Sequence, residues 1–127
     1  MIIAGSKDPA YCTPFSDGEH TALADTTREK GGNGGGFWPH NLLEAALATC
    51  INITLRKYAD KNAIPLSNAS TKVKLDRSRP GEAVFSYEVE LQGNLTQPQR
   101  EALLKVAGDC PVKATLLKRI SFKYGVD

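Results

Sequence analysis

The sequence predicts an α+β fold with mainly antiparallel strand pairing, and three observations support this fold class. Alternating apolar residues near 69–77 and 83–92 are typical of half-buried strands. One long, mostly apolar stretch over residues 41–62 has the pattern of a buried helix. The complete order of elements is βββ-α-ββ-α-α-β, with short turns between neighbouring strands. We therefore expect a single domain over residues 1–127, in which a mainly antiparallel sheet packs on a long central helix.

The N-terminal part is expected to contain short strands at 1–5, 10–16 and 19–25. Ser16-Asp17-Gly18-Glu19 has the composition of the turn between the last two. A glycine-rich stretch, residues 31–36, follows and is expected to be a mobile loop or a close backbone approach. A phosphate-binding loop is the alternative, although the stretch lacks the Gly-Lys-Ser/Thr ending of a P-loop.

Pro39 suits the start of the long helix, which is apolar almost all the way round as far as Ile53. Such a helix should be buried on most sides, and in so small a domain a second subunit could cover one face. The next two strands should be joined by a turn at Arg79-Pro80-Gly81-Glu82.

The C-terminal part is expected to contain two helices and a last strand. Thr96-Gln97-Pro98-Gln99 has the form of a capping box, which starts a helix that runs to about residue 107. A short helix over 111–118 and a strand over 119–125 complete the chain. The second half of the chain is thus expected to contain two strands, two helices and one further strand, in that order.

The overall composition excludes several classes of function. Of the 127 residues, 41% are hydrophobic and 24% are charged, and the net charge of +2 is too small to indicate a nucleic-acid partner. No stretch approaches the roughly 18 apolar residues of a membrane span, and the start lacks the pattern of a signal peptide. Three cysteines are too few, and odd in number, for a secreted disulfide framework. We therefore expect a cytoplasmic protein with no membrane partner and with functional or buried thiols.

The cysteines are the main candidates for chemistry. Pro111 fits the first position of a helix, so Cys110 would be its N-cap, where unpaired N–H groups and the helix dipole favour a thiolate. Alternatively, this cysteine simply replaces the usual serine or aspartate cap. Cys50 has apolar helical neighbours, so it is either a small core residue or a thiol activated by a cation or donor that the fold supplies. Cys12 is interpreted as structural or incidental.

Metal binding by the cysteines with His20 or His40 is a weaker interpretation. The sequence contains neither a Cys-x-x-Cys nor a His-x₃-His spacing. We expect no metal and no cofactor.

Two motifs resemble those of the OsmC/Ohr family. The first is Leu-Leu-x-Ala-Ala-Leu-Ala-x-Cys, which ends at Cys50, and the second is Cys110-Pro111-Val112-x-x-Thr115-Leu116. Either motif alone is weak, but both in order, 60 residues apart, make a specific signal, and the similarity covers about residues 23–124. The resemblance implies an OsmC-like fold, an intertwined homodimer, and a thiol-dependent peroxidase that reduces organic hydroperoxides in oxidative-stress defence.

The resemblance also implies an order of action. Cys50 would attack the peroxide and become a sulfenic acid, Cys110 would resolve it as a disulfide, and an external thiol or dithiol would reduce that disulfide. His40 stands where the organic hydroperoxide resistance branch carries a glutamate, so the chain looks more like the broader OsmC-like branch. Arg28, the only arginine ahead of Cys50, and Glu44 are candidates for activating the thiol.

Phe37, Trp38 and His40 are candidates for the wall of a peroxide pocket, with core anchoring or an exposed helix start as the alternative. An alternative function is that of a non-catalytic protein that binds a small apolar ligand and has inert cysteines. A structural disulfide between Cys50 and Cys110 is a third reading, which a cytoplasmic setting disfavours.

Overall fold

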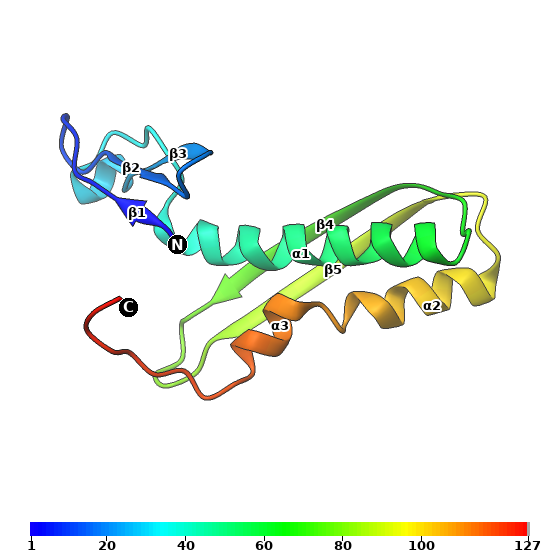
Figure 1. Ribbon diagram of the computed structural model, residues 1–127. Helices are drawn as coiled ribbons and strands as arrows, with labels where there is room; N and C mark the ends of the chain where they lie inside the picture. Colours follow the sequence, from blue (N-terminus) through cyan, green and yellow to red (C-terminus); the bar gives the residue numbers. More distant parts are fainter. Residues whose placement is uncertain (127) are drawn as a thin grey trace. The chain divides into compact units, whose positions relative to one another are not determined.

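The computed structural model describes residues 1–126 and confirms the α+β class with antiparallel sheets (Figure 1). The elements in chain order are β1 (Ile3–Ala4), β2 (Thr13–Ser16), β3 (Thr21–Ala24), the 3₁₀ turn η1 (Arg28–Lys30), α1 (Pro39–Lys61), β4 (Leu66–Asp76), β5 (Val84–Gly93), α2 (Gln97–Ala107) and α3 (Pro111–Leu116). The chain forms two compact units, Met1–Glu44 and a second that begins at Ala45. The single domain expected from the sequence stays a prediction.

The second unit is built on the β4–β5 hairpin, which α1 crosses on one face (Figure 1). The strands pair antiparallel from Leu66↔Gly93 to Asp76↔Val84. The turn expected at 79–82 is present, with Gly81 at φ +75°. One stripe of α1 is buried on this face: Leu47, Ile51, Leu55 and Ala59. Their four-residue spacing places them on the same side of the helix, so α1 and the hairpin share one core.

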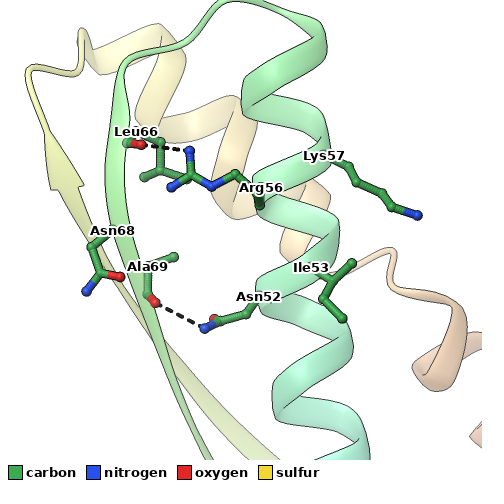
Figure 2. Close-up of a pocket in the computed structure, with 7 residues that line it drawn as sticks. All are labelled: Asn52, Ile53, Arg56, Lys57, Leu66, Asn68 and Ala69. Carbon is green, nitrogen blue, oxygen red and sulfur yellow. Dashed lines mark hydrogen bonds between the residues drawn. The ribbon is translucent and has the colours of Figure 1, made fainter.

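Polar side chains of α1 also bind β4. Asn52 Nδ2 donates to the Ala69 carbonyl at 3.0 Å and Arg56 donates to the Leu66 carbonyl at 2.8 Å, across a groove of about 310 Å³ (Figure 2). Thr71 Oγ1 in turn donates to Asn52 Oδ1 at 2.6 Å. β4 is an edge strand, and these bonds occupy carbonyl oxygens that such a strand would otherwise leave to water or to another chain.

The burial of α1 differs from the expectation. Outside the buried stripe, several apolar or small side chains of this helix are open to solvent, and Ile53 is 55% exposed. The prediction of burial on most sides is wrong for the single chain. The physical reason is geometric, because a two-stranded sheet and the helices that follow it can cover only part of a helix surface.

Local signals for α2 and α3 are confirmed. Thr96 Oγ1 accepts from the Gln99 N–H at 3.2 Å, and Gln99 Oε1 accepts from the Thr96 N–H at 3.0 Å, which is a complete capping box. Leu103 and Ala107 lie on the inner face of α2 and are buried in the core. α3 begins at Pro111 with Cys110 as its N-cap, as the sequence predicts, although it ends at Leu116.

The last expected strand is not formed. The backbone of residues 119–126 pairs with no strand, and apolar side chains there, such as Phe122 at 96%, are exposed. Alternating apolar residues form a strand only when their backbone makes hydrogen bonds with a neighbouring strand. Here β4 and β5 pair with each other, and the segment joins neither of them. The prediction of a strand at 119–125 is therefore wrong.

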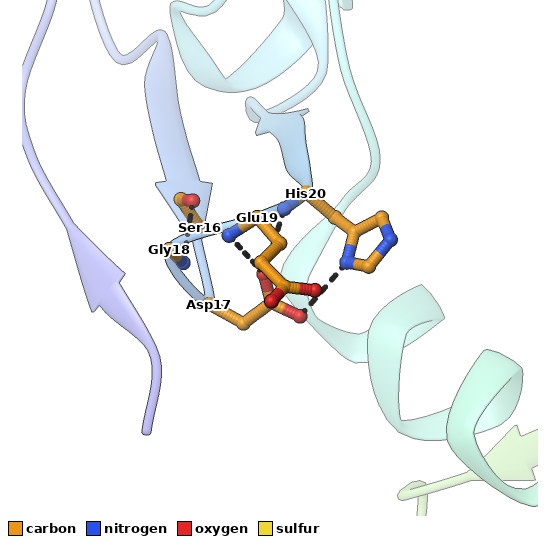
Figure 3. A network of polar contacts seen from close by, with 5 residues as sticks. All are labelled: Ser16, Asp17, Gly18, Glu19 and His20. Atoms are coloured by element: carbon orange, nitrogen blue, oxygen red, sulfur yellow. Dashed lines mark hydrogen bonds and ion pairs between the residues drawn. The ribbon is translucent and has the colours of Figure 1, made fainter.

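The first unit contains the antiparallel sheet β1-β2-β3, whose last two strands are joined by the expected turn (Figure 3). Asp17 Oδ1 accepts from the N–H groups of Glu19 at 2.9 Å and His20 at 2.7 Å. Asp17 Oδ2 lies 3.0 Å from His20 Nδ1, and Gly18 has φ +105°. These contacts keep the pKa of Asp17 below its usual value, mainly through the backbone bond from His20.

The glycine-rich loop is held by an aspartate that the sequence reasoning did not single out. Asp25 is 5% exposed, and its carboxylate accepts backbone N–H bonds from Thr26 at 2.7 Å, Gly35 at 3.1 Å and Asn33 at 3.3 Å. These bonds lower the pKa of Asp25, and that from Gly35 has the largest effect. Gly32 lies so close to the Thr26 carbonyl that a side chain would overlap it. The loop is thus a close backbone approach. Its Asn33 and Gly35 N–H groups bind Asp25, and those of Gly31, Gly32 and Gly34 donate to backbone carbonyls, so these groups are not available to a phosphate.

None of the helices within residues 1–126 combines the length and hydrophobicity that crossing a membrane requires.

Candidate functional site

Cys50 and Cys110 meet in the second unit. Cys50 lies on the middle of α1 and Cys110 caps α3, and the consecutive N–H groups of Val112 and Lys113 bind the two sulfurs, while both cysteines are free. Cys110 is fully buried, whereas Cys50 is half-buried. The fold therefore brings together the two cysteines that the sequence motifs single out.

The first turn of α3 supplies a hydrogen-bond donor to each sulfur. The Val112 N–H donates to Cys50 Sγ at 3.5 Å, and the Lys113 N–H donates to Cys110 Sγ at 3.4 Å. These N–H groups are free for this role because the first turn of a helix has no intrahelical acceptors for them. The bond to Cys50 is the donor that sequence reasoning required but could not locate, since it depends on how α3 packs against α1.

The titration of Cys110 differs from the expectation for an N-cap. Burial raises the pKa of the Cys110 thiol, and the hydrogen bond from Lys113 offsets this rise only in part. The neighbouring Cys50 raises it further. The expected thiolate at Cys110 is therefore wrong. Cys110 is a protonated thiol at neutral pH and is able to donate to Cys50.

Cys50 opens onto a cavity of about 660 Å³. The lining residues come from one side of α1 and from the start of α3: Ala46, Thr49, Cys50, Ile53, Thr54, Lys57, Asp109, Pro111 and Val112. Cys110 is not among them, so only one of the paired thiols faces the cavity. The volume lies within the range of small-molecule sites, and the lining is mainly apolar but includes one basic and one acidic residue.

The aromatic candidates belong to the first unit. The rings of Trp38 and His40 have centroids 4.7 Å apart, and Lys30 Nζ lies 5.0 Å from the Trp38 ring centroid. His40 Nδ1 is buried and has no hydrogen-bond partner among residues 1–126. The Phe37 side chain is exposed, while its backbone bonds to that of Leu23 at 2.9 Å. A role for Phe37, Trp38 and His40 in a peroxide pocket stays a prediction.

The two candidates for thiol activation also lie in the first unit. Arg28 is in η1, and its Nε donates to the Asn33 carbonyl at 3.4 Å. Glu44 accepts from Asn41 Nδ2 at 2.8 Å. Their proposed action on Cys50 stays a prediction. Within the described chain, no group of three or more His, Cys, Asp or Glu side chains is arranged to hold a metal ion.

Solved structures with the same fold cover nearly the whole chain. An organic hydroperoxide resistance protein OsmC from Legionella pneumophila is 24% identical, with a TM-score of 0.66 over 92% of this chain and 88% of that one. An OsmC-like protein from Mycoplasma pneumoniae is 19% identical, with a TM-score of 0.75 over 91% and 85%. The organic hydroperoxide resistance protein OhrB of Bacillus subtilis is 18% identical, with a TM-score of 0.62 over 92% and 89%.

A search of the curated proteins found no significant match. The family of OsmC-like proteins matches residues 31–125, a range that includes both cysteine motifs. The chain therefore belongs to the OsmC family.

Proposed function

We propose that this protein is a thiol-dependent peroxidase that reduces organic hydroperoxides through Cys50 and Cys110. The observation that carries the proposal is the arrangement of the two sulfurs. Cys50 faces a cavity and accepts a hydrogen bond from the Val112 N–H, while the neighbouring Cys110 is fully buried and does not line that cavity. The Val112 N–H thus donates to the sulfur on which negative charge must reside for attack on a peroxide.

The proposed peroxidase reaction has three steps. The Cys50 thiolate attacks the outer oxygen of the hydroperoxide, the O–O bond breaks, and an alkoxide leaves and is protonated to the alcohol. The Cys50 sulfenic acid then condenses with the Cys110 thiol, which forms a disulfide and releases water. An external dithiol reduces the disulfide by exchange and is itself oxidised. Because Cys110 already contacts Cys50, resolution requires only local movement.

Family membership supports a role in peroxide-related stress defence, since several proteins of this fold are named organic hydroperoxide resistance proteins. We place this protein in the cytoplasm, where thiol reductants are available. We also propose a homodimer. The open face of α1 around Ile53 supports it, because this exposed apolar surface lies beside the Cys50 cavity.

The proposal is tested by consumption of cumene hydroperoxide in the presence of dithiothreitol. The parent should turn over, the Cys50→Ser variant should not, and Cys12→Ser is the matched control because that cysteine lies in the first unit. A Cys50→Ser protein as active as the parent would show that the mechanism is wrong. Mass spectrometry after one equivalent of hydroperoxide distinguishes the peroxidase from the alternative function, a ligand-binding protein. The peroxidase thiols should become oxidised, whereas the thiols of a ligand-binding protein would stay unmodified.

The homodimer has its own measurement. Light scattering should give twice the chain mass, and Ile53→Glu should shift the protein toward the monomer, because it places a charge on the exposed apolar face of α1. A monomeric parent protein would contradict the dimer and leave the peroxidase test standing.

A further inference from the structure

A second cavity of the second unit lies apart from the thiols. Its volume is about 400 Å³, and it is formed by the start of β5, by α3 and by the residues that follow α3. Seven of its nine lining residues are apolar, among them Leu47, Phe85 and Leu116. No residue lines both this cavity and the Cys50 cavity. The size and the lining are those of a site for a small apolar or amphipathic molecule.

The two remaining lining residues are Lys113 and Tyr87, and their polar ends lie close together. Lys113 Nζ is 5.9 Å from the centroid of the Tyr87 ring. A methyl group built on Gly108 would lie 3.6 Å from the Tyr87 hydroxyl and 3.8 Å from Lys113 Nζ. The ammonium of Lys113 and the phenol of Tyr87 therefore lie close together, near Gly108, and both residues line the cavity.

Lys113 is half-buried, and none of the ion pairs within residues 1–126 gives it a carboxylate partner. A cation beside apolar surface is unfavourable unless a counter-charge or hydrogen bonds compensate it. The tyrosine ring offers partial compensation through its π-face. A ligand carboxylate would complete the compensation of the Lys113 charge, since the ammonium and the phenol are both hydrogen-bond donors.

We propose that this cavity binds a small amphipathic carboxylate. The apolar tail lies against Leu47, Phe85 and Leu116, and the carboxylate accepts hydrogen bonds from Lys113 Nζ and the Tyr87 hydroxyl. The charge at one end and the apolar lining elsewhere favour this class over neutral alkanes or cationic amphiphiles. The site goes beyond the proposed peroxidase activity and does not depend on it.

The test uses decanoate, below its micelle-forming concentration, in isothermal titration calorimetry with the full chain. Lys113→Met should weaken binding about tenfold or more, because a charge-assisted hydrogen bond is removed. Lys118→Met is the matched control, since Lys118 is an exposed lysine just after α3 that does not line the cavity. Thermal unfolding of both variants checks that they are folded, and Tyr87→Phe should weaken binding by a smaller factor.

Several outcomes would overturn the proposal. Absence of decanoate binding to the parent refutes the site. Equal binding of decyltrimethylammonium, or an unchanged affinity in Lys113→Met, would mean apolar adsorption only. The Cys50→Ser variant should bind decanoate like the parent, so failure of the peroxidase proposal and failure of this one are separate results.

Discussion

Replacement of Cys110 separates the capping role that the structure shows for its sulfur from the resolving role that we propose for it. This atom is the proposed resolving thiol, and it also accepts the Lys113 N–H at 3.4 Å as the N-cap of α3. Alanine removes both roles. Serine removes only the redox role, because its hydroxyl is itself a good N-cap acceptor. The pair of variants therefore distinguishes chemistry from folding.

The magnitudes follow from the burial and the cap. Loss of an N-cap acceptor costs about 1 kcal/mol, and deletion of a fully buried sulfur costs about another 1 kcal/mol through lost contacts and a small cavity. We expect the Cys110→Ala variant to unfold about 8 °C below the parent, at roughly 4 °C per kcal/mol for a domain of this size. Cys110→Ser should unfold no more than about 4 °C below it, because the cap is retained.

The assays are thermal unfolding followed by circular dichroism and mass spectrometry of the oxidised thiol. Both variants should consume about one equivalent of hydroperoxide and stop at a Cys50 sulfenic acid, which dimedone traps. If serine destabilises the protein as much as alanine, the capping role is refuted. If Cys110→Ser turns over at the parent's rate, the resolving role is refuted.

Three further predictions concern pH and the glycine-rich loop. Because burial raises the pKa of Cys110 above the ordinary value of 9.0, its contribution to stability is complete below pH 9 and is lost as pH rises through the higher folded value. The urea midpoint of the parent should therefore fall relative to that of Cys110→Ser above pH 9, and parallel curves would contradict this. The pH dependence expected for the contribution of Asp25 has the opposite sign, because its pKa is lowered from 3.8. Its contribution is present above pH 3.8 and is lost as pH falls through the lower folded value, so the difference in urea midpoint between the parent and Asp25→Asn should shrink at low pH, and a constant difference would count against the reasoning. Gly32→Ala should lower the unfolding temperature, because its methyl group would overlap the Thr26 carbonyl, whereas Gly35→Ala should be tolerated, with its nearest neighbour, Asp25 Oδ2, at 3.5 Å. Equal unfolding temperatures for the two glycine variants would contradict the close approach.

Local structure could largely be predicted from short stretches of sequence. The turn at Asp17-Gly18, the Thr96–Gln99 capping box and the Cys110 N-cap are all present where the residues indicate them. Each of these depends on contacts within about four residues, so the necessary information lies side by side in the chain.

The features that the sequence reasoning predicted wrongly or missed have a common cause, because each depends on residues that are distant in the chain. Residues 119–125 carry the alternation of a strand but pair with neither edge of the two-stranded β4–β5 sheet. The face of α1 around Ile53 has the composition of a buried surface but is left open by the single chain. Asp25 was overlooked because its three N–H donors come from residues up to ten positions away.

The two cysteines show which properties the sequence determined and which depend on the tertiary structure. The resemblance of two motifs to those of the OsmC/Ohr family singled out Cys50 and Cys110 as the pair, and Pro111 predicted a helix that begins beside Cys110. Only the tertiary structure decided which thiol faces a cavity, which is buried and protonated, and which N–H group meets Cys50. Burial and donor geometry at a sulfur depend on how α1 and α3 pack, and residues 60 positions apart contact each other only after the chain has folded.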